Sequence, residues 1–200
     1  QIIFKQQNVY RFKAIVLNIT KIRDNNTRIV MISSEYWKIT GWWNKKNITG
    51  IDLWDIVEVL ISRESSRNTI KGVDLLTSWW NKDWDYSKIL SFLEILHLVN
   101  KISKDWSDCG SLFADTSFFI EYWNREILKP YHYSIFQMRI LKSLGTMDPE
   151  IIWDDAILRY IYQHISHTPL ERILWSSNIK NNHITKIQQI NFHSIYMLEK

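Results

Sequence analysis

The hydrophobic pattern of this 200-residue chain changes once, close to residue 80. Before that point, short apolar segments alternate with clusters of polar turn residues such as Asp24–Asn26. After it, apolar residues recur at i, i+3, i+4, i+7 and i+10, the spacing of one helical face, at Ile89, Phe92, Leu93, Leu96 and Val99. Strands followed by helices are typical of the α+β class, and we predict that class for this chain.

The first part of the chain predicts a small β-barrel. Five segments have the alternation or the β-branched content of strands: Tyr10–Leu17, Thr27–Ile32, Trp37–Thr40, Asp55–Ile61 and Asn68–Val73. Five short strands within residues 9–76 indicate a closed barrel, and the OB-fold is the common five-stranded form. From the strands alone, an SH3-like barrel fits nearly as well.

The second part predicts an all-helical domain. Beyond the apolar stripe described above, helices are expected over residues 110–128, 131–144 and 150–166. A further helix should begin at Thr168-Pro169, because Thr, Pro and a following Glu171 form a capping box. The last 20 residues fit no single element. We therefore predict two domains, a barrel over residues 1–79 and a helical domain over residues 80–200.

Tryptophan is overabundant and glycine scarce, with eleven tryptophans against five glycines. Several tryptophans occupy predicted turns, as at Trp37 and Trp54, where glycine would reach φ > 0 without steric cost. One hypothesis is that the source lineage reads TGA codons as Gly, and that they were translated here as Trp. Positions 37, 43 and 54 should then have turn geometry, some with φ > 0, and exposed side chains. The alternative is a naturally Trp-rich protein from an AT-rich genome.

Positive charge is concentrated near the N-terminus. Residues 1–50 carry nine Lys and Arg side chains against two acidic ones, whereas residues 51–200 carry 16 basic and 19 acidic side chains. A basic barrel joined to a slightly acidic domain indicates a polyanion-binding module attached to something else. A solvated basic surface without a nucleic-acid partner has the same charge pattern.

The chemistry-bearing residues do not form the pattern of an enzyme. The single Cys109 excludes a disulfide framework and a cysteine-based zinc site, and it fits a reducing cytoplasm. No signal-peptide core and no apolar run of roughly 18 residues is present, so we expect no membrane span. A start at Gln1 instead of Met suggests a trimmed or partial N-terminus. No motif for nucleotide binding or nucleophilic catalysis occurs, and we expect no catalytic residues, metal or cofactor.

A loop between barrel strands carries the most suggestive group of cations. In Gly41–Asn47, Lys45 and Lys46 stand beside two aromatic residues, and cations next to rings are typical of single-strand binding surfaces. We predict that Lys45 and Lys46, helped by Arg28 and Lys38, contact DNA phosphates on one face of the barrel.

Several segments occur in the order found in one known family. Ala14–Leu17 resembles the first strand of the bacterial recombination mediator RecO. Ser34–Ile39 followed by Trp43–Lys46 is similar to the family's glycine- and lysine-containing segment, with Trp37 and Trp43 where the family has glycine.

The second domain continues the resemblance. Tyr86–Asn100 looks like the family's first long helix, and Phe136–Gly145 resembles its F-x-x-x-L-L-x-x-L-G helix. Pro169–Leu174 resembles the late P-L-x-S-R-x-L segment, with Glu171 replacing the serine. The resemblance implies an N-terminal OB-fold followed by a helical domain. Many members carry a four-cysteine zinc insertion, but the interval 146–168 has no cysteine, which implies a version without that insertion.

The resemblance also implies partners. The family binds single- and double-stranded DNA, anneals complementary strands, and acts with RecR to load RecA onto DNA coated by single-stranded-DNA-binding protein (SSB). Its helical domain receives the acidic, apolar C-terminal tail of SSB. The side chains that would supply an apolar pocket and a cation here are Phe136, Arg139, Leu141, Lys142 and Arg172.

Other interpretations of the same residues stay open. Phe136 and Leu141 would equally serve as the core of a helical bundle. The whole chain would also suit a different OB-containing module that binds RNA or single-stranded DNA. A third alternative, from another functional class, is a non-catalytic scaffold protein whose basic half is incidental. Salt-dependent binding to oligonucleotides separates the first two functions from the third.

Overall fold

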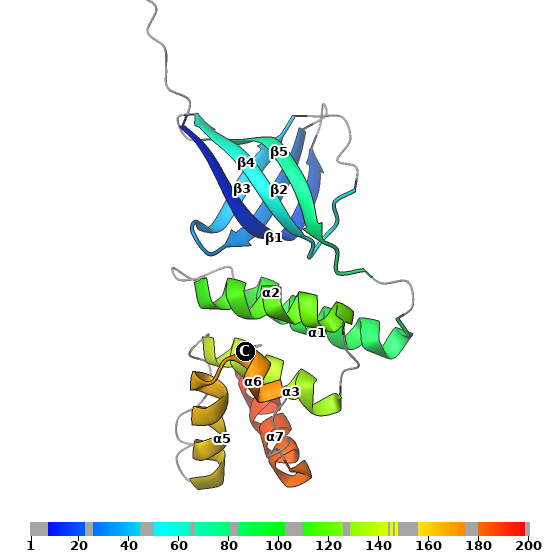
Figure 1. The fold of residues 1–200 in the computed structure, drawn as a ribbon, viewed down its shortest axis with the longest axis vertical. Helices are drawn as coiled ribbons and strands as arrows, with labels where there is room; N and C mark the ends of the chain where they lie inside the picture. Colours follow the sequence, from blue (N-terminus) through cyan, green and yellow to red (C-terminus); the bar gives the residue numbers. More distant parts are fainter. Residues whose placement is uncertain are drawn as a thin grey trace, which may run out of the picture. The chain divides into compact units, whose positions relative to one another are not determined.

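The computed structural model describes residues 8–22, 26–44, 50–64, 67–80, 84–102, 110–125, 129–143, 145, 147, 156–174 and 180–198. Its elements (Figure 1) are β1 (Asn8–Ile22), β2 (Asn26–Ser33), β3 (Trp37–Trp43), β4 (Ile56–Glu64), β5 (Arg67–Thr77), α1 (Tyr86–Ile102), α2 (Gly110–Arg125), α3 (Pro130–Ser143), α5 (Ala156–His167), α6 (Leu170–Leu174) and α7 (Asn181–Leu198). All the strands precede the helices, which confirms the predicted α+β class and the change of pattern near residue 80.

The strands close into an OB-fold barrel. Their order around the barrel is β1-β2-β3-β5-β4, and β4 pairs with β1 to close it. A simple meander would pair β3 with β4, but here β3 runs parallel to β5, with Trp42 opposite Thr69. The other four pairs of strands are antiparallel. This crossing is the Greek-key connection of the OB-fold, so the predicted five-stranded OB barrel is confirmed.

Alternation along the strands fills the barrel interior. Every second residue of a strand points to the same face, and the inward-facing side chains are apolar. The buried core consists of Phe12, Ala14, Val16, Ile29, Met31, Trp43, Val57, Val59, Ile61 and Ile70. Gly41 allows β3 to approach this core closely, because a Cβ atom there would lie 2.6 Å from the Ile70 side chain.

A buried aspartate holds the end of the barrel opposite the β2–β3 turn. The β1–β2 register shifts after Val16, whose N–H donates to the Asp55 carbonyl at 3.1 Å and whose carbonyl accepts from the Trp54 N–H at 2.6 Å. The Asp55 carboxylate accepts hydrogen bonds from the N–H groups of Asp52 at 2.7 Å and Trp79 at 3.3 Å. Burial raises the pKa of Asp55, and these hydrogen bonds oppose that rise. Asp55 thus ties the segment before β4 to the segment after β5.

Two tryptophans occupy backbone conformations that favour glycine. Among the described residues, Trp37 and Trp54 alone combine a side chain with positive φ, at 56° and 71°. Trp37 ends the β2–β3 turn, where it pairs with Ser33, and its side chain is 48% exposed. A left-handed residue is common where a hairpin loop returns to its strand. The expectation of an exposed turn residue is confirmed at position 37.

The expectation of turn geometry with an exposed side chain is half right at position 54 and wrong at position 43. Trp54 has the expected positive φ, but its side chain is buried, with 6% exposed. Trp43 lies in β3, and its side chain packs into the barrel core. The reason is register, because Trp43 follows Gly41 on the inward-facing side of the strand.

The chain divides into two compact units, which are described separately. The barrel unit comprises Gln1–Trp84 and Ser103–Asn124, and the helical unit comprises Asp85–Ile102 and Arg125–Lys200. Helix α2 thus belongs almost wholly to the barrel unit, in which Asn124 donates a hydrogen bond to the Ser78 carbonyl at 2.7 Å. The predicted boundary between residues 79 and 80 stays a prediction.

Helix α3 is the centre of the helical unit. It packs against α1, α5 and α7. Asn191 of α7 is buried and donates hydrogen bonds to the Ser134 carbonyl at 2.9 Å and to the Gln137 side chain at 3.1 Å. The helices expected over residues 110–128 and 131–144 are confirmed as α2 and α3, and α5 covers most of the one expected over residues 150–166. No helix in the described part of the chain has the length and apolarity needed to cross a membrane.

The helical unit should lose stability in mild acid. His132 is buried near the start of α3, where its Nδ1 accepts the Lys129 N–H at 3.3 Å. Burial lowers the pKa of His132 from its ordinary value of 6.5, so the unfolded chain takes up a proton more readily than the folded one. The free energy of unfolding should therefore fall as the pH drops below about 6.5.

Chemical denaturation between pH 8 and pH 5 measures this effect. His132→Asn retains an acceptor for the Lys129 N–H but cannot titrate, so its pH dependence should be flatter than that of the wild-type protein. Equal slopes for the two proteins would contradict a neutral buried His132.

Candidate nucleic-acid interface

The outer side of the barrel brings together one aromatic ring and two guanidinium groups. Trp42 alternates with the inward-facing Gly41 and Trp43, so its side chain lies outside the barrel. Arg28 of β2 stands directly opposite Trp42 and is exposed. From the other side, the Arg67 guanidinium lies over the Trp42 ring, 4.3 Å from its centroid. We call Arg28, Trp42 and Arg67 the outer patch.

The geometry of the outer patch follows from strand order. Directly opposed residues on neighbouring antiparallel strands have Cβ atoms about 5 Å apart, which brings Arg28 next to the Trp42 ring. The parallel pairing of β3 with β5 brings the start of β5, and with it Arg67, to the opposite edge of the ring. A guanidinium over an indole face is a favourable cation–π contact. The three side chains thus form a row across β2, β3 and β5.

The other predicted phosphate ligands have different outcomes. Lys38 is half-buried in β3, on the same side of the strand as Trp42, as alternation requires. Lys45 and Lys46 lie outside the described residues. Arg28 and Lys38 are therefore the two predicted cations that the structure places on β2 and β3.

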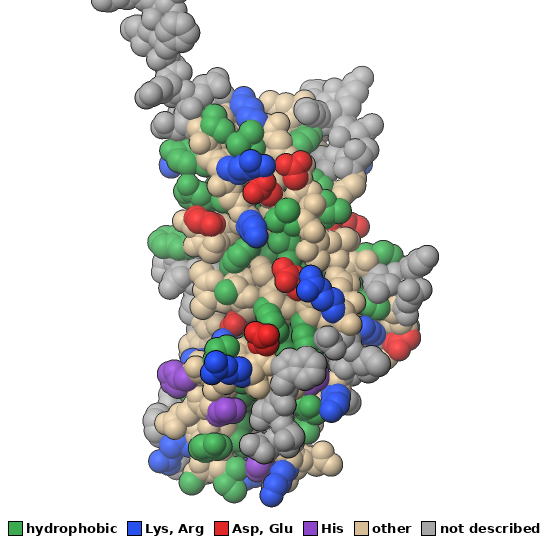
Figure 2. Space-filling view, in the orientation of Figure 1, with side chains coloured by type: hydrophobic (Ala, Val, Ile, Leu, Met, Phe, Trp, Pro, Cys, Tyr) green, Lys and Arg blue, Asp and Glu red, His purple; other side chains and the backbone are tan. Residues whose placement is uncertain are grey.

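The sequence did not single out Arg67. It follows a cluster of serines in the sequence, and its neighbour across the sheet, Trp42, is far away in the chain. Pairing of β3 with β5 is what brings it to Trp42, and no local pattern shows that pairing. In contrast, Arg11 does not add to the patch, because its guanidinium pairs with Glu58 and lies 4.0 Å from Asp74. Figure 2 shows basic and acidic side chains interspersed over the barrel on the face that it draws.

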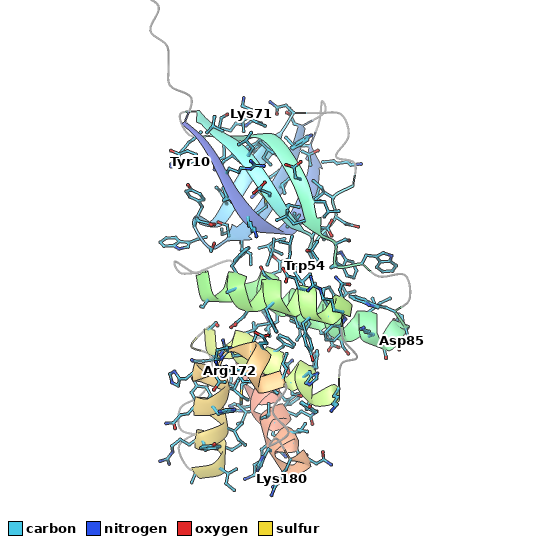
Figure 3. The ribbon with its side chains drawn as sticks, viewed as in Figure 1. Tyr10, Trp54, Lys71, Asp85, Arg172 and Lys180 are labelled. Carbon is cyan, nitrogen blue, oxygen red and sulfur yellow. The ribbon has the colours of Figure 1, made fainter. Side chains whose placement is uncertain are left out.

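The residues predicted to receive an SSB tail do not line one groove. Phe136 and Leu141 are buried, with 1% and 0% of their side chains exposed, so they belong to the core of the helical unit. The expectation that Phe136 lines a groove open to solvent is wrong, because α3 turns this face toward its neighbouring helices. Arg172 of α6 is exposed (Figure 3).

Two of the predicted cations hold the end of another helix. Arg139 donates hydrogen bonds to the carbonyls of Ile165, Ser166 and Thr168, at 2.6, 3.2 and 3.2 Å. Lys142 donates to the Ser166 carbonyl at 3.0 Å. Carbonyls in the last turn of a helix lack partners within that helix, and cations there satisfy them and complement the helix dipole. Arg139 and Lys142 thus fasten α3 to the end of α5.

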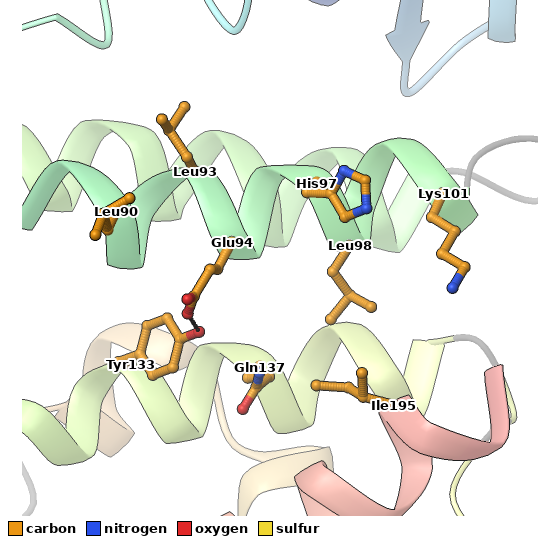
Figure 4. Close-up of a pocket in the computed structure, with 9 residues that line it drawn as sticks. All are labelled: Leu90, Leu93, Glu94, His97, Leu98, Lys101, Tyr133, Gln137 and Ile195. Atoms are coloured by element: carbon orange, nitrogen blue, oxygen red, sulfur yellow. Dashed lines mark hydrogen bonds between the residues drawn. The ribbon is translucent and has the colours of Figure 1, made fainter. Parts of the chain in front are cut away.

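An apolar pocket does exist in the helical unit, at a different place. A cavity of about 420 Å³ lies among α1, α3 and α7. Its lining residues, all labelled in the close-up of Figure 4, are Leu90, Leu93, Glu94, His97, Leu98, Lys101, Tyr133, Gln137 and Ile195. The Tyr133 hydroxyl donates to the Glu94 carboxylate at 2.6 Å, and burial together with this acceptor raises the pKa of Tyr133. We call this cavity the helical pocket.

The helical pocket combines an apolar wall with a cation at one end. Leu98 and Ile195 approach each other across it, and Lys101 lies beyond them in the last turn of α1 (Figure 4). This combination suits a ligand with an apolar side chain and a carboxylate. Leu93 belongs to the apolar stripe that was visible in the sequence, but the contributions of Leu90 and of α7 were not predicted.

Comparison with known proteins adds no identity to these observations. No protein-family model matches the chain, and no curated protein matches it. In the described residues, no group of three or more His, Cys, Asp and Glu side chains is arranged to hold a metal ion.

Proposed function

We propose that this chain is a DNA-binding recombination mediator of the RecO type, acting in the cytoplasm without catalytic chemistry. Its barrel would bind single-stranded DNA through the outer patch, and its helical unit would bind protein partners. The observation that carries the proposal is the row formed by Arg28, Trp42 and Arg67 on an OB-fold barrel. The face around strands 2 and 3 is where OB-folds bind oligonucleotides.

The chemistry of the outer patch favours a single strand. An unpaired base presents its π-face to an aromatic ring, and Trp42 stands between two cations that can reach the flanking phosphates. Arg28 has no ion-pair partner among the described residues, so its charge is available to a phosphate. In a duplex the bases are stacked inside, and Trp42 would contribute little. Binding of double-stranded DNA, which the resemblance implies, would then rest on the cations alone.

The helical pocket is a better candidate for the binding site of a protein partner than the surroundings of Phe136 are. An acidic, apolar tail such as that of SSB would place its apolar side chain near Leu98 and its carboxylate near Lys101. Arg172 would remain an exposed cation elsewhere on the helical unit. Association with RecR, and through it loading of RecA, completes the proposed role.

Replacing both arginines of the outer patch tests the DNA-binding part. The double variant Arg28→Ala/Arg67→Ala should bind a single-stranded oligonucleotide more weakly at every sequence. The slope of log K against log salt should become shallower by about 1.4, because each phosphate contact to a single strand contributes ~0.7. Fluorescence anisotropy over a range of salt concentrations measures both quantities.

A charge-matched variant controls for net charge. Lys13 is exposed on β1 opposite Glu58 of β4, and Lys180 is exposed just before α7, so Lys13→Ala/Lys180→Ala removes the same charge without touching the outer patch. This variant should retain most of the slope. Equal losses in the two double variants would show that only overall charge matters, and would contradict a site at Trp42. Stronger binding to RNA than to DNA of the same sequence would favour the RNA-binding alternative.

A further inference from the structure

One end of the barrel is open and lined by aromatic and polar side chains. A cavity of about 280 Å³ is surrounded there by Tyr10, Tyr36, Ile39, Ile61, Arg63 and Asn68. These residues come from β1, the β2–β3 turn, β3, β4 and β5. Figure 3 labels Tyr10 near this end, and Trp54 at the opposite end of the barrel. We call this cavity the barrel mouth.

The barrel mouth is a continuation of the barrel interior. Tyr10 pairs with Ile61 across β1 and β4, and both lie on the inward-facing side of their strands. Two residues beyond Ile61, Arg63 of β4 pairs with Asn68 of β5. By alternation, both belong to the inward-facing rows that end at Ile61 and Ile70. A guanidinium and an amide therefore replace apolar side chains at the last inward-facing position.

Tyr36 forms a fixed wall of the barrel mouth. Its ring lies 5.7 Å from that of Tyr10, nearly perpendicular to it, and 4.9 Å from that of Phe12. Its backbone N–H donates to the Ser33 hydroxyl at 2.8 Å, which fixes the turn that carries it. With 41% of the side chain exposed, Tyr36 still presents ring surface to a ligand.

Arg63 and Asn68 supply the polar groups. Asn68 donates one hydrogen bond to the Thr40 carbonyl at 3.2 Å, which fixes the amide and leaves its oxygen as an acceptor. Arg63 has no ion-pair partner among the described residues. Tyrosine rings beside a donor and an acceptor are the surroundings in which proteins hold unpaired bases, by stacking and by hydrogen bonds to the base edge.

We propose that the barrel mouth holds one unpaired nucleobase of the single strand bound at the outer patch. This inference rests on the proposed function, and it makes single-stranded nucleic acid the preferred ligand. Arg67 and Asn68 are consecutive in β5, one at the outer patch and the other in the barrel mouth. A strand lying on Trp42 can thus turn one base around the rim. The cavity is below the usual range for drug-sized ligands, roughly 300–1,000 Å³, and suits a single planar ring.

The experiment compares two probes of equal charge. One is an oligothymidylate, and the other has the same length and phosphates but abasic residues in place of the bases. Wild-type protein should bind the first more tightly. Tyr36→Ala should weaken binding of the oligothymidylate by roughly 5- to 100-fold, as expected for loss of one base–aromatic contact, and leave the abasic probe unaffected. Tyr36→Phe should behave like wild type.

A second variant keeps the test valid if Tyr36→Ala unfolds the turn. Arg63→Gln leaves the aromatic wall intact, and it should also reduce the preference for the base-containing probe. Tyr86→Ala is the matched control, because Tyr86 is 75% exposed on α1 and lies outside the barrel mouth. Circular dichroism verifies the fold of each variant.

The outcomes separate this inference from the proposed function. If Tyr36→Ala, in folded form, and Arg63→Gln both keep the wild-type preference, the barrel mouth holds no base. The proposed function survives that result provided that Arg28→Ala/Arg67→Ala still shows the shallower slope of log K against log salt. Equal binding of the two probes by wild type would also overturn the base site while leaving phosphate binding intact. Failure of wild type to bind either probe would overturn both proposals.

Discussion

Phe136→Ala is expected to lower the free energy of unfolding of the helical unit by about 3–5 kcal/mol, the usual cost of truncating a buried phenylalanine. Phe136 lies in α3, which packs against three other helices, and only 1% of its side chain is exposed. The cavity left by the substitution would be enclosed by those helices, and collapse would disturb all of them. Chemical denaturation followed by circular dichroism measures the loss.

An identical substitution on the same unit provides the control. Phe192 lies on α7 with 75% of its side chain exposed, so Phe192→Ala should change the free energy of unfolding by less than about 0.5 kcal/mol. A small effect at Phe136 would contradict its place in the core. It would also restore the interpretation in which this side chain lines an open groove for a partner.

Phe136 illustrates a limit of reading a helix from its sequence. A phenylalanine followed by leucines and basic residues suits both a bundle core and a peptide groove. The difference depends on which helices cover that face, and α7 was the segment that the sequence left without an assignment. Arg139 is similar, because its role depends on carbonyls about 26 residues further along the chain, at the end of α5. Local spacing contains no information about such a contact.

The barrel was more predictable than its site. Alternation gave the five strands and the inward-facing rows, since a one-residue slip would move every apolar side chain to solvent. It could not distinguish an OB-fold from an SH3-like barrel, because that choice depends on the pairing of β3 with β5. The same pairing brings Arg67 to Trp42 and Asn68 to the barrel mouth. Arg28 and Lys38 were predictable because they lie on strands that charge and alternation already marked.

The tryptophan-rich turns connect composition to backbone geometry. Left-handed conformations cost an L-amino acid roughly 1–2 kcal/mol relative to glycine, and the two described side-chain-bearing residues with positive φ are both tryptophan. Backbone geometry does not support a glycine at every tryptophan position. Trp43 packs in the barrel core and is not among the residues with positive φ. If position 42 is also glycine in the natural protein, Arg28 and Arg67 remain as phosphate ligands, and stacking on the outer patch is lost.

Stability of two variants at position 37 tests the geometric part of this hypothesis. Trp37→Gly should have a free energy of unfolding about 1–2 kcal/mol higher than that of Trp37→Ala, because only glycine removes the left-handed penalty. About half of the Trp37 side chain is buried, and both substitutions lose that contact equally. Trp37→Ala is the matched control, since alanine also lacks the indole but keeps the Cβ that disfavours φ = 56°. Equal stabilities of the two variants would contradict backbone strain at position 37.

The mass of the protein from its natural source decides whether recoding occurs. Each glycine in place of a tryptophan lowers the intact mass by about 129 Da, so recoding at positions 37 and 54 alone would lower it by about 258 Da. Peptide mapping would then assign the replaced positions one by one. We expect glycine at positions 37 and 54, where φ is positive, whatever the result at the other nine. An intact mass that requires all eleven tryptophans would end the hypothesis, and Trp37 and Trp54 would then be strained residues that the barrel holds in place.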